Sequence, residues 1–243
     1  MSNILKKINQ GEYQMSQESY EGICCYCNEV VTKRTVGKHL DKCKEKKALD
    51  SQFGNENNFK FFSLLVEATY DKSFWILIEV SSVLTLKNID QFLRDIWLEC
   101  CGHLSAFYHS KTKIAMSRKL YDVFQKGLIL DYEYDFGSTT DLKIKILSQI
   151  DSSDKKQIRV LAVNKKSEIL CSACREKQSI YDCTLCGEEL CESCTKTHQC
   201  FIDEGEEYIA EKVNSPRSGV CGYDGQNKFI IKKYFPKDIP NVL

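Results

Sequence analysis

The alternation of apolar and polar positions predicts a compact α+β region in the middle of the chain. Apolar, β-prone runs at 61–69 and 73–80 flank a short polar turn, a pattern typical of a β-hairpin. Apolar residues then recur with helical spacing after Thr85, which is a suitable N-cap. The helical positions are Ile89, Phe92, Leu93, Ile96 and Trp97. We expect this helix to place its apolar, aromatic face on the sheet as core.

The same patterns predict further elements on both sides of this region. They are a strand at 103–109, a helix at 117–126, a hairpin of strands at 130–136 and 142–146, and strands at 157–163 and 228–235. Ser117 is the expected cap of the second helix, and Gly127 is its expected end. The polar segment 44–58 is typical of a linker, and residues 1–20 of a loose tail.

Charge and composition limit the compartments in which the protein is expected and the partners that it can bind. The chain has 243 residues with 34 basic and 34 acidic side chains, so its formal net charge is +0 and nucleic-acid binding would need a local patch. The first ten residues lack the apolar run of a signal peptide. The longest apolar run, Phe74 to Ile78, is far too short for a membrane span. We therefore expect a cytoplasmic protein without membrane contact.

Cysteine usage points to metal binding. Several of the 14 cysteines occur as C-x2-C pairs with histidine nearby, which favours a reducing compartment and thiolate–metal bonds over disulfides. One thirty-residue stretch holds eight such ligands. They are Cys171, Cys174, Cys183, Cys186, Cys191, Cys194, His198 and Cys200. Two C-x2-C pairs complete one tetrahedral zinc site, so this stretch has ligands for two ions.

The pairing of these eight ligands follows from loop length. Consecutive pairing would leave the second ion in a very short loop, so we favour an interleaved cross-brace. Its first site takes Cys171, Cys174, Cys191 and Cys194, and its second takes Cys183, Cys186, His198 and Cys200. We expect His198 and Cys200 to share one face of a strand. The arrangement resembles the B-box, HIT and MYND zinc fingers, which are mostly protein-interaction modules.

A third zinc site is expected near the N-terminus. Cys24 and Cys27 form a C-x2-C pair, and His39 and Cys43 follow with the spacing of a ββα finger whose fourth ligand is cysteine. His39 and Cys43 would lie one turn apart on a helix. Cys25 is left over. Together the sequence predicts three Zn²⁺ ions, and because every site has four protein ligands we expect structural rather than catalytic zinc.

Basic residues gather around the N-terminal finger. Lys33, Arg34, Lys38 and Lys42 belong to a local cluster that outnumbers the nearby acidic residues. Such a stripe can contact nucleic-acid phosphates, although a solvated helix face gives the same pattern. A single finger reads only about three base pairs, so RNA or non-specific DNA binding is the easier hypothesis.

The middle of the chain resembles the plasmid pRiA4b Orf-3-like family, often described as passenger proteins of mobile elements. The resemblance rests on a helix, a strand and a hairpin over about residues 60–165, and more loosely on the tail from Pro216 to Tyr223. The motifs are Thr85-Leu86-Lys-Asn-Ile89-Asp-Gln-Phe92-Leu93, His103-Leu104-Ser-Ala-Phe107 and Tyr132-Glu-Tyr134-Asp135-Phe136-Gly137. The resemblance implies a small α+β fold and no settled activity.

This chain departs from the family pattern after the hairpin glycine. The family has Asp, Trp and His where this chain has Ser138, Thr140 and Leu142. An activity that depends on those three residues would be lost here.

The expected fold class is α+β, a small antiparallel-sheet domain with packed helices flanked by two zinc-binding modules. The expected segments are a flexible tail at 1–20, a finger at 21–47, the α+β domain at 59–165, the two-zinc finger at 168–202, and a tail at 203–243 that packs back on the α+β domain. We expect a non-enzymatic protein-interaction or adaptor module, with nucleic-acid binding through the basic finger as the alternative.

An enzyme is the least favoured hypothesis. Asp135-Phe136-Gly137 spells a kinase motif, but the rest of the kinase set is missing from the sequence. Cys221 lies in a glycine-flanked turn and is a candidate reactive thiol, yet nothing in the sequence places His103 or His109 near it. The pair Cys100-Cys101 is expected in the core.

Overall fold

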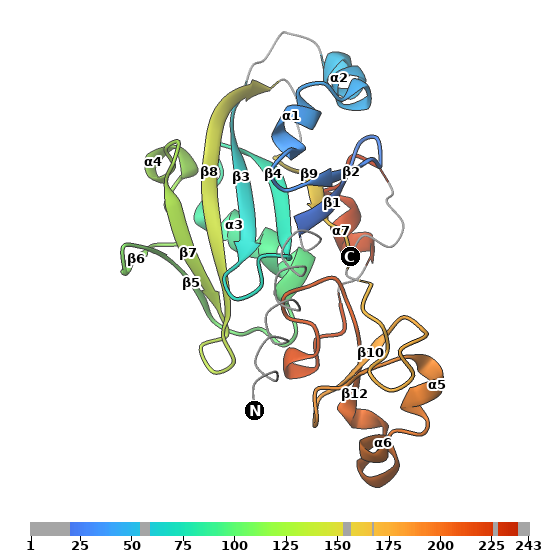
Figure 1. The fold of residues 1–243 in the computed structure, drawn as a ribbon. Helices are drawn as coiled ribbons and strands as arrows, with labels where there is room; N and C mark the ends of the chain where they lie inside the picture. The colour runs from blue at the N-terminus through green and yellow to red at the C-terminus, as the bar shows by residue number, and fades with distance from the viewer. Residues whose placement is uncertain (1–19, 54–58, 153–156, 167, 226–227, 238–243) are drawn as a thin grey trace, which may run out of the picture.

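The computed structural model describes residues 20–53, 59–152, 157–166, 168–225 and 228–237, so the predicted tail at 1–20 lies outside the described residues except for Tyr20. The main element is a nine-stranded sheet. Its strands are β1 (Glu21–Cys24), β2 (Val30–Thr32), β3 (Phe59–Ala68), β4 (Trp75–Ser81), β5 (Ser105–His109), β6 (Thr112–Ile114), β7 (Ile129–Tyr134), β8 (Thr140–Ser152) and β9 (Ile158–Asn164). The sheet is antiparallel throughout, in the order β2-β1-β9-β4-β3-β8-β7-β5-β6 (Figure 1).

The α+β class expected from the sequence is confirmed, and the sheet is larger than predicted. β3 pairs with β4 and β7 pairs with β8, as the two predicted hairpins require. The sheet grows because β1 pairs with β9, with Ile23 opposite Val163. The N-terminal finger, which was expected to flank the domain, therefore contributes two strands to its sheet.

One face of the sheet is covered by the predicted amphipathic helix. It is α3 (Leu86–Leu93), and it begins at Thr85 with a capping box that includes Asn88. A π-helical turn, Arg94–Leu98, continues it. Ile89, Phe92 and Trp97 are fully buried in the same core cluster as Ile76 and Ile78 of β4. The aromatic stripe is core, as its spacing predicted.

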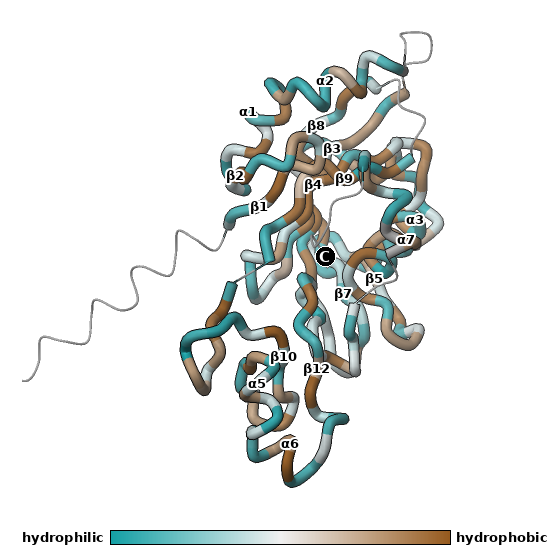
Figure 2. The backbone as a smooth tube through the Cα atoms, turned by 90° about the vertical axis from the view of Figure 1, so that its right-hand side faces the viewer, coloured by the Kyte–Doolittle hydropathy of each residue, from teal (hydrophilic) through white to brown (hydrophobic). Residues whose placement is uncertain are grey.

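The other face, at β4 and β9, is covered by the N-terminal finger. Side chains alternate along a strand, so Trp75 and Leu77 point away from α3. They pack with Val36 and Leu40, which lie on helix α1 (Val36–Leu40). All seven residues of β4 and of β9 are buried because both of their faces are covered. Figure 2 shows the strands between the finger helices on one side and α3 on the other.

Partly buried ion pairs fasten the finger to this face. Arg159 of β9 bonds Glu79 of β4 and lies 2.9 Å from Asp50 of helix α2 (Lys44–Asp50). Lys33 lies 3.2 Å from Glu67 of β3. Hydrogen bonds and charge from two lysines lower the pKa of Glu67 although its burial acts in the opposite direction. The finger is thus held by charge as well as by apolar contact.

Two predicted segments adopt other structures. The predicted linker at 44–58 begins with α2, in which Asp50 pairs with Lys46 and with Arg159 of the sheet. Residues 54–58 lie outside the described residues. The helix predicted at 117–126 is reduced to α4 (Leu120–Val123). Ser117 is not the cap of this helix. The backbone before α4 is extended, and Lys119, the N-cap residue, forms a β-bridge with Thr85.

The strand predicted at 228–235 is wrong. The segment forms helix α7 (Lys228–Lys232) and ends with Tyr234 and Phe235 buried in the main core. A short apolar run is compatible with either structure, so packing decides. Here the ring of Tyr234 meets Phe92 of α3 edge-on at 4.9 Å.

A second, smaller unit follows β9. Its elements are β10 (Tyr181–Cys183), β11 (Glu189–Leu190), β12 (Ile209–Glu211), α5 (Glu192–Thr195) and α6 (Gln199–Glu204). The strands form a three-stranded sheet in the order β11-β10-β12. Short 3₁₀ turns lie at Ser51–Phe53, Glu206–Tyr208 and Val220–Gly222. Across the described ranges, no helix is both long and apolar enough to cross a membrane.

Substitution of Gly22 tests whether the finger packs closely against the sheet. A methyl group at this position would lie 2.5 Å from the carbonyl oxygen of Val163 and against the Trp75 ring. We expect Gly22→Ala to cost about 1–3 kcal/mol, as overpacking does, and to lower the melting temperature by several degrees. Gly37→Ala is the matched control, because a methyl group there meets nothing within 4 Å. Equal melting temperatures for the two variants would contradict this packing.

Candidate metal centres

Three of the C-x2-C pairs share one backbone turn. The amide of the residue after the second cysteine donates to the carbonyl of the first, from Asn28 to Cys24 at 2.9 Å, from Arg175 to Cys171 at 2.8 Å and from Gly187 to Cys183 at 2.8 Å. Each donor residue has a positive φ, at 64°, 57° and 76° respectively. This turn directs both sulfurs of a pair to the same side, as a shared metal requires.

The N-terminal donors come together from three elements. Cys24 ends β1, Cys27 lies in the following turn, His39 is on α1 and Cys43 directly precedes α2. All four donor atoms lie within 4.8 Å of one another, and Nε2 of His39 is 3.3 Å from Sγ of Cys27. The left-over Cys25 is buried in the main core instead. The structure therefore groups the four expected side chains and leaves out the fifth.

The eight donors of the second unit form two groups. One group contains Cys171, Cys174, Cys191 and Cys194, and the other contains Cys183, Cys186, His198 and Cys200. This is the interleaved grouping that loop length favours. Sγ of Cys174 lies 3.9 Å from Sγ of Cys191, and Sγ of Cys186 lies 3.4 Å from Nε2 of His198.

These separations fit a tetrahedral zinc ion. Four donors at about 2.3 Å from one zinc ion lie about 3.8 Å from each other. Disulfide sulfurs would be about 2.05 Å apart, and every cysteine is free. The sites are thus compatible with zinc and with four protein ligands each.

Two local expectations about these sites are wrong. His39 and Cys43 do not share a helix, because α1 ends at Leu40 and Cys43 has an extended backbone before α2. His198 and Cys200 do not lie on a strand, because His198 caps α6 and Cys200 lies in its first turn. In both cases one of the two residues is the N-cap of a short helix, Cys43 for α2 and His198 for α6, and the donor atoms still converge.

Both histidine-containing sites repeat one arrangement. Glu29 lies 3.5 Å from Nδ1 of His39, and Glu188 lies 3.5 Å from Nδ1 of His198. In each site the carboxylate faces one ring nitrogen while the other nitrogen faces the sulfurs, the usual outer-shell arrangement of zinc-bound histidine. The spacing C-x2-C-x-E-x9-H occurs at both sites, so this carboxylate partner has a signal in the sequence that the C-x2-C and His-x-Cys patterns do not include.

Thiol ionisation in the first group of the second unit is uneven. A hydrogen bond with the Ser193 hydroxyl lowers the pKa of Cys191 to about 6, whereas contacts with Cys191 and Cys171 raise the pKa of Cys194 to about 12. The negative charge of one thiolate therefore opposes the ionisation of the neighbouring thiol. A divalent cation removes this repulsion, since a coordinating thiol is deprotonated outright.

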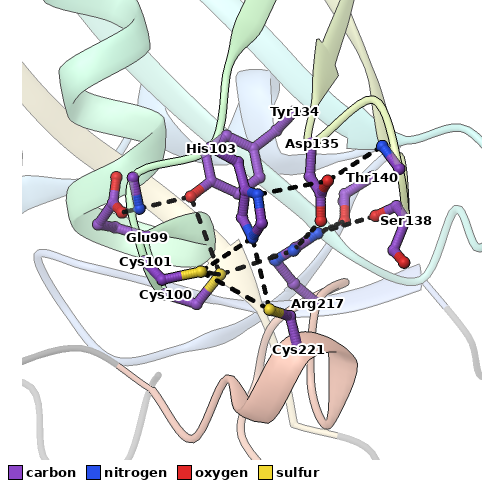
Figure 3. Close-up of polar contacts among 12 residues, drawn as sticks. Glu99, Cys100, Cys101, His103, Tyr134, Asp135, Ser138, Thr140, Arg217 and Cys221 are labelled. Carbon is purple, nitrogen blue, oxygen red and sulfur yellow. Dashed lines mark hydrogen bonds and ion pairs between the residues drawn. The ribbon is translucent and has the colours of Figure 1, made fainter.

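The structure also gathers a fourth group that the sequence did not predict. Cys100, Cys101, His103 and Cys221 have donor atoms within 4.8 Å of one another (Figure 3). The expectation that both cysteines lie in the core is wrong for Cys101, which is exposed, whereas the half-buried Cys100 packs against the edge of the main core. The local signal was C-C-x-H, but its partner Cys221 is 118 positions beyond His103.

The basic cluster of the finger is divided between two roles. Lys33 is engaged with Glu67 and with the carbonyl of Lys72, so it serves the docking of the finger. Arg34, Lys38 and Lys42 are exposed. Only these three of the four predicted phosphate contacts face solvent.

Comparisons with known proteins assign no family. No family model matches the chain, and no curated protein matches it. One similar solved structure is the crystal structure of a protein of unknown function, MM3350, from Methanosarcina mazei Go1. It is 18% identical, covers 44% of this chain and 70% of that chain, and has a TM-score of 0.39. This similarity supports no argument about function, and the pRiA4b Orf-3-like assignment stays a prediction.

Adjacent cysteines in the finger provide a matched test of ligation. We expect Cys24→Ser to reduce the zinc content of the intact protein by one ion, because a ligand is lost. Cys25→Ser should retain the full content, because its buried sulfur lies outside the donor group. Native mass spectrometry of protein purified without chelator measures both. Loss of an ion from Cys25→Ser alone would overturn the assignment of Cys24.

Proposed function

We propose that the protein is a non-enzymatic, zinc-binding module for protein interaction, acting as an adaptor. The three sites that the sequence predicts would each hold a structural Zn²⁺ ion. Each offers four protein donors, whereas a catalytic zinc keeps a position open for water or substrate. The ions would then stabilise the folded conformation of these segments, which is the usual role of zinc in interaction modules.

The observation that carries this proposal is the surface of the two-zinc unit. Leu185, between the ligands Cys183 and Cys186, is 50% exposed, and Ile202 on α6 is 61% exposed. Both lie within two residues of a ligand of the same site, so zinc binding would fix their positions. We infer that the two side chains form one apolar patch, and a contiguous exposed patch marks an interaction site.

Acidic residues next to this surface indicate the character of the partner. Asp203 and Glu204 end α6, and Glu206 and Glu207 follow; all four side chains are exposed. An apolar centre with a charged rim is the usual plan of a protein interface. We therefore propose a protein partner that presents apolar side chains flanked by lysine or arginine.

The family and cellular context remain proposals from sequence. The pRiA4b Orf-3-like resemblance of residues 60–165 would link the protein to mobile elements, and the cysteine usage would place it in the cytoplasm. Neither affects the interaction surface, which belongs to the two-zinc unit.

Leu185→Glu combined with Ile202→Glu tests the surface. We expect the double variant to lose protein partners in a pull-down while keeping its zinc content, because both side chains are exposed and neither is a ligand. Val83→Glu is the control, since Val83 is equally exposed at 55% but lies on the main domain. Identical recovery by wild type and both variants would contradict the proposed interface.

A second candidate function is nucleic-acid binding through the finger. It is favoured by the exposed side chains of Arg34, Lys38 and Lys42 on and beside α1. Against it, α1 has five residues and buries Val36 and Leu40 on the sheet, which leaves one narrow face for contact.

Changing these three basic residues to glutamine separates the two functions. If the finger contacts phosphates, affinity for single-stranded RNA should fall and the slope of log affinity against log salt should become shallower by about 0.7 per lost contact. Fluorescence anisotropy at several salt concentrations measures this. Binding that is absent, or that does not depend on salt, excludes this candidate and leaves the interaction module.

A further inference from the structure

The fourth Cys/His group joins two distant parts of the chain. Cys100, Cys101 and His103 follow the π-helical turn at the end of α3, and Cys221 comes from the C-terminal segment. Figure 3 shows the three sulfurs and the imidazole directed toward one another. The two parts are otherwise linked by hydrogen bonds, including Ser215 Oγ to the carbonyl of Trp97 at 2.7 Å.

The distances within the group are those of a coordination shell. Sγ of Cys101 lies 3.8 Å from Sγ of Cys100 and 3.7 Å from Sγ of Cys221. Nε2 of His103 lies 3.0 Å from Sγ of Cys101 and 3.4 Å from Sγ of Cys221. The two Sγ–Sγ distances match the edge of about 3.8 Å in a tetrahedral thiolate site, and the Nε2–Sγ distances are shorter, in the direction that the shorter Zn–N bond requires. We propose that the group binds a fourth Zn²⁺ ion with a Cys₃His ligand set.

The neighbouring side chains are arranged as an outer shell for such an ion. Oδ1 of Asp135 lies 3.4 Å from Nδ1 of His103, so the carboxylate orients the ring with Nε2 toward the sulfurs. This is the arrangement that Glu29 and Glu188 make with the histidines of the other sites.

Arg217 is the second outer residue. Its guanidinium is fully buried, and it donates to Oδ2 of Asp135 at 2.6 Å and to Sγ of Cys100 at 3.6 Å. Three thiolates leave a zinc site with one excess negative charge, and a buried cation next to a sulfur compensates it. The same guanidinium donates to the carbonyl of Ser138 and to Thr140, which fixes it in place.

Two other chemistries use the same atoms. Cys221, His103 and Asp135 have the order of a nucleophile, base and orienting carboxylate. The exposed thiols of Cys101 and Cys221 are also close enough to form a disulfide after a small shift. The metal is favoured because it uses all four donors, whereas a triad leaves Cys100 and Cys101 without a role and a disulfide leaves Cys100 and His103 without one.

The ion would hold the C-terminal segment in a strained conformation. Cys221 has φ 54° and ψ 36°, between Gly219 at φ 73° and Gly222 at φ 67°. A left-handed backbone is unfavourable at a cysteine, and a metal bond is one means of stabilising it. Cys101 and Cys221 are exposed, so this ion would exchange faster than those in the other sites.

Native mass spectrometry with thiol alkylation tests the proposal on the full chain. We expect four zinc ions in the wild type and three in Cys221→Ser, with four retained in Cys25→Ser. In the wild type, iodoacetamide should modify Cys101 and Cys221 only after a limiting amount of chelator has removed the first zinc ion. This second measurement needs no variant and remains valid if Cys221→Ser folds poorly.

The contradicting results are equally specific. Three ions in both the wild type and Cys221→Ser would overturn the fourth site. Three ions, together with a chain mass two hydrogens below that of the fully reduced protein, would identify a disulfide instead. Rapid alkylation of Cys221 in the zinc-loaded wild type would indicate a free nucleophile and also overturn it. None of these results depends on the interaction surface around Leu185 and Ile202.

Discussion

Convergence of thiolate and imidazole donors is the interaction on which the structure outside the main sheet depends. The second unit has a small apolar core of Cys171, Cys183, Leu190 and Cys191. Such a core is too thin to offset the entropy of ordering the segment. A structural zinc ion contributes on the order of 10 kcal/mol to the folding of a zinc-finger peptide. Two such ions, one at each donor group, would be sufficient to specify this unit.

The N-terminal finger shows how a metal site can become part of a larger core. Its four donors converge from β1, the following turn, α1 and the start of α2, and a bound ion would hold these elements together. The finger covers the face of β4 and β9 that carries Trp75 and Leu77. The finger therefore shields the apolar side chains of β4 and β9 from solvent, and its strands β1 and β2 extend the sheet. Ion pairs through Arg159 and Lys33 add to this packing, so the finger is part of the main unit.

How much was predictable depends on the range of the interactions involved. The hairpins, the capped helix at Thr85 and the interleaved donor groups follow from patterns within a few tens of residues. Local turn chemistry decides them, as the repeated hydrogen bond in three C-x2-C turns illustrates. The sequence could not predict what distant packing decides. Cys221 lies near His103 in a segment whose Arg217 is buried against Asp135, and the segment at 228–235 packs through Tyr234, whose ring lies against Phe92.

Hydrogen exchange with and without a zinc chelator tests the central dependence on metal most directly. We expect chelation to abolish amide protection throughout residues 171–200, while β3 and β8 at the centre of the sheet stay protected by their own ladder of hydrogen bonds. Such a split would show that coordination folds the second unit independently of the sheet. Unchanged protection of residues 171–200, in protein shown by mass to have lost its metal, would contradict the account.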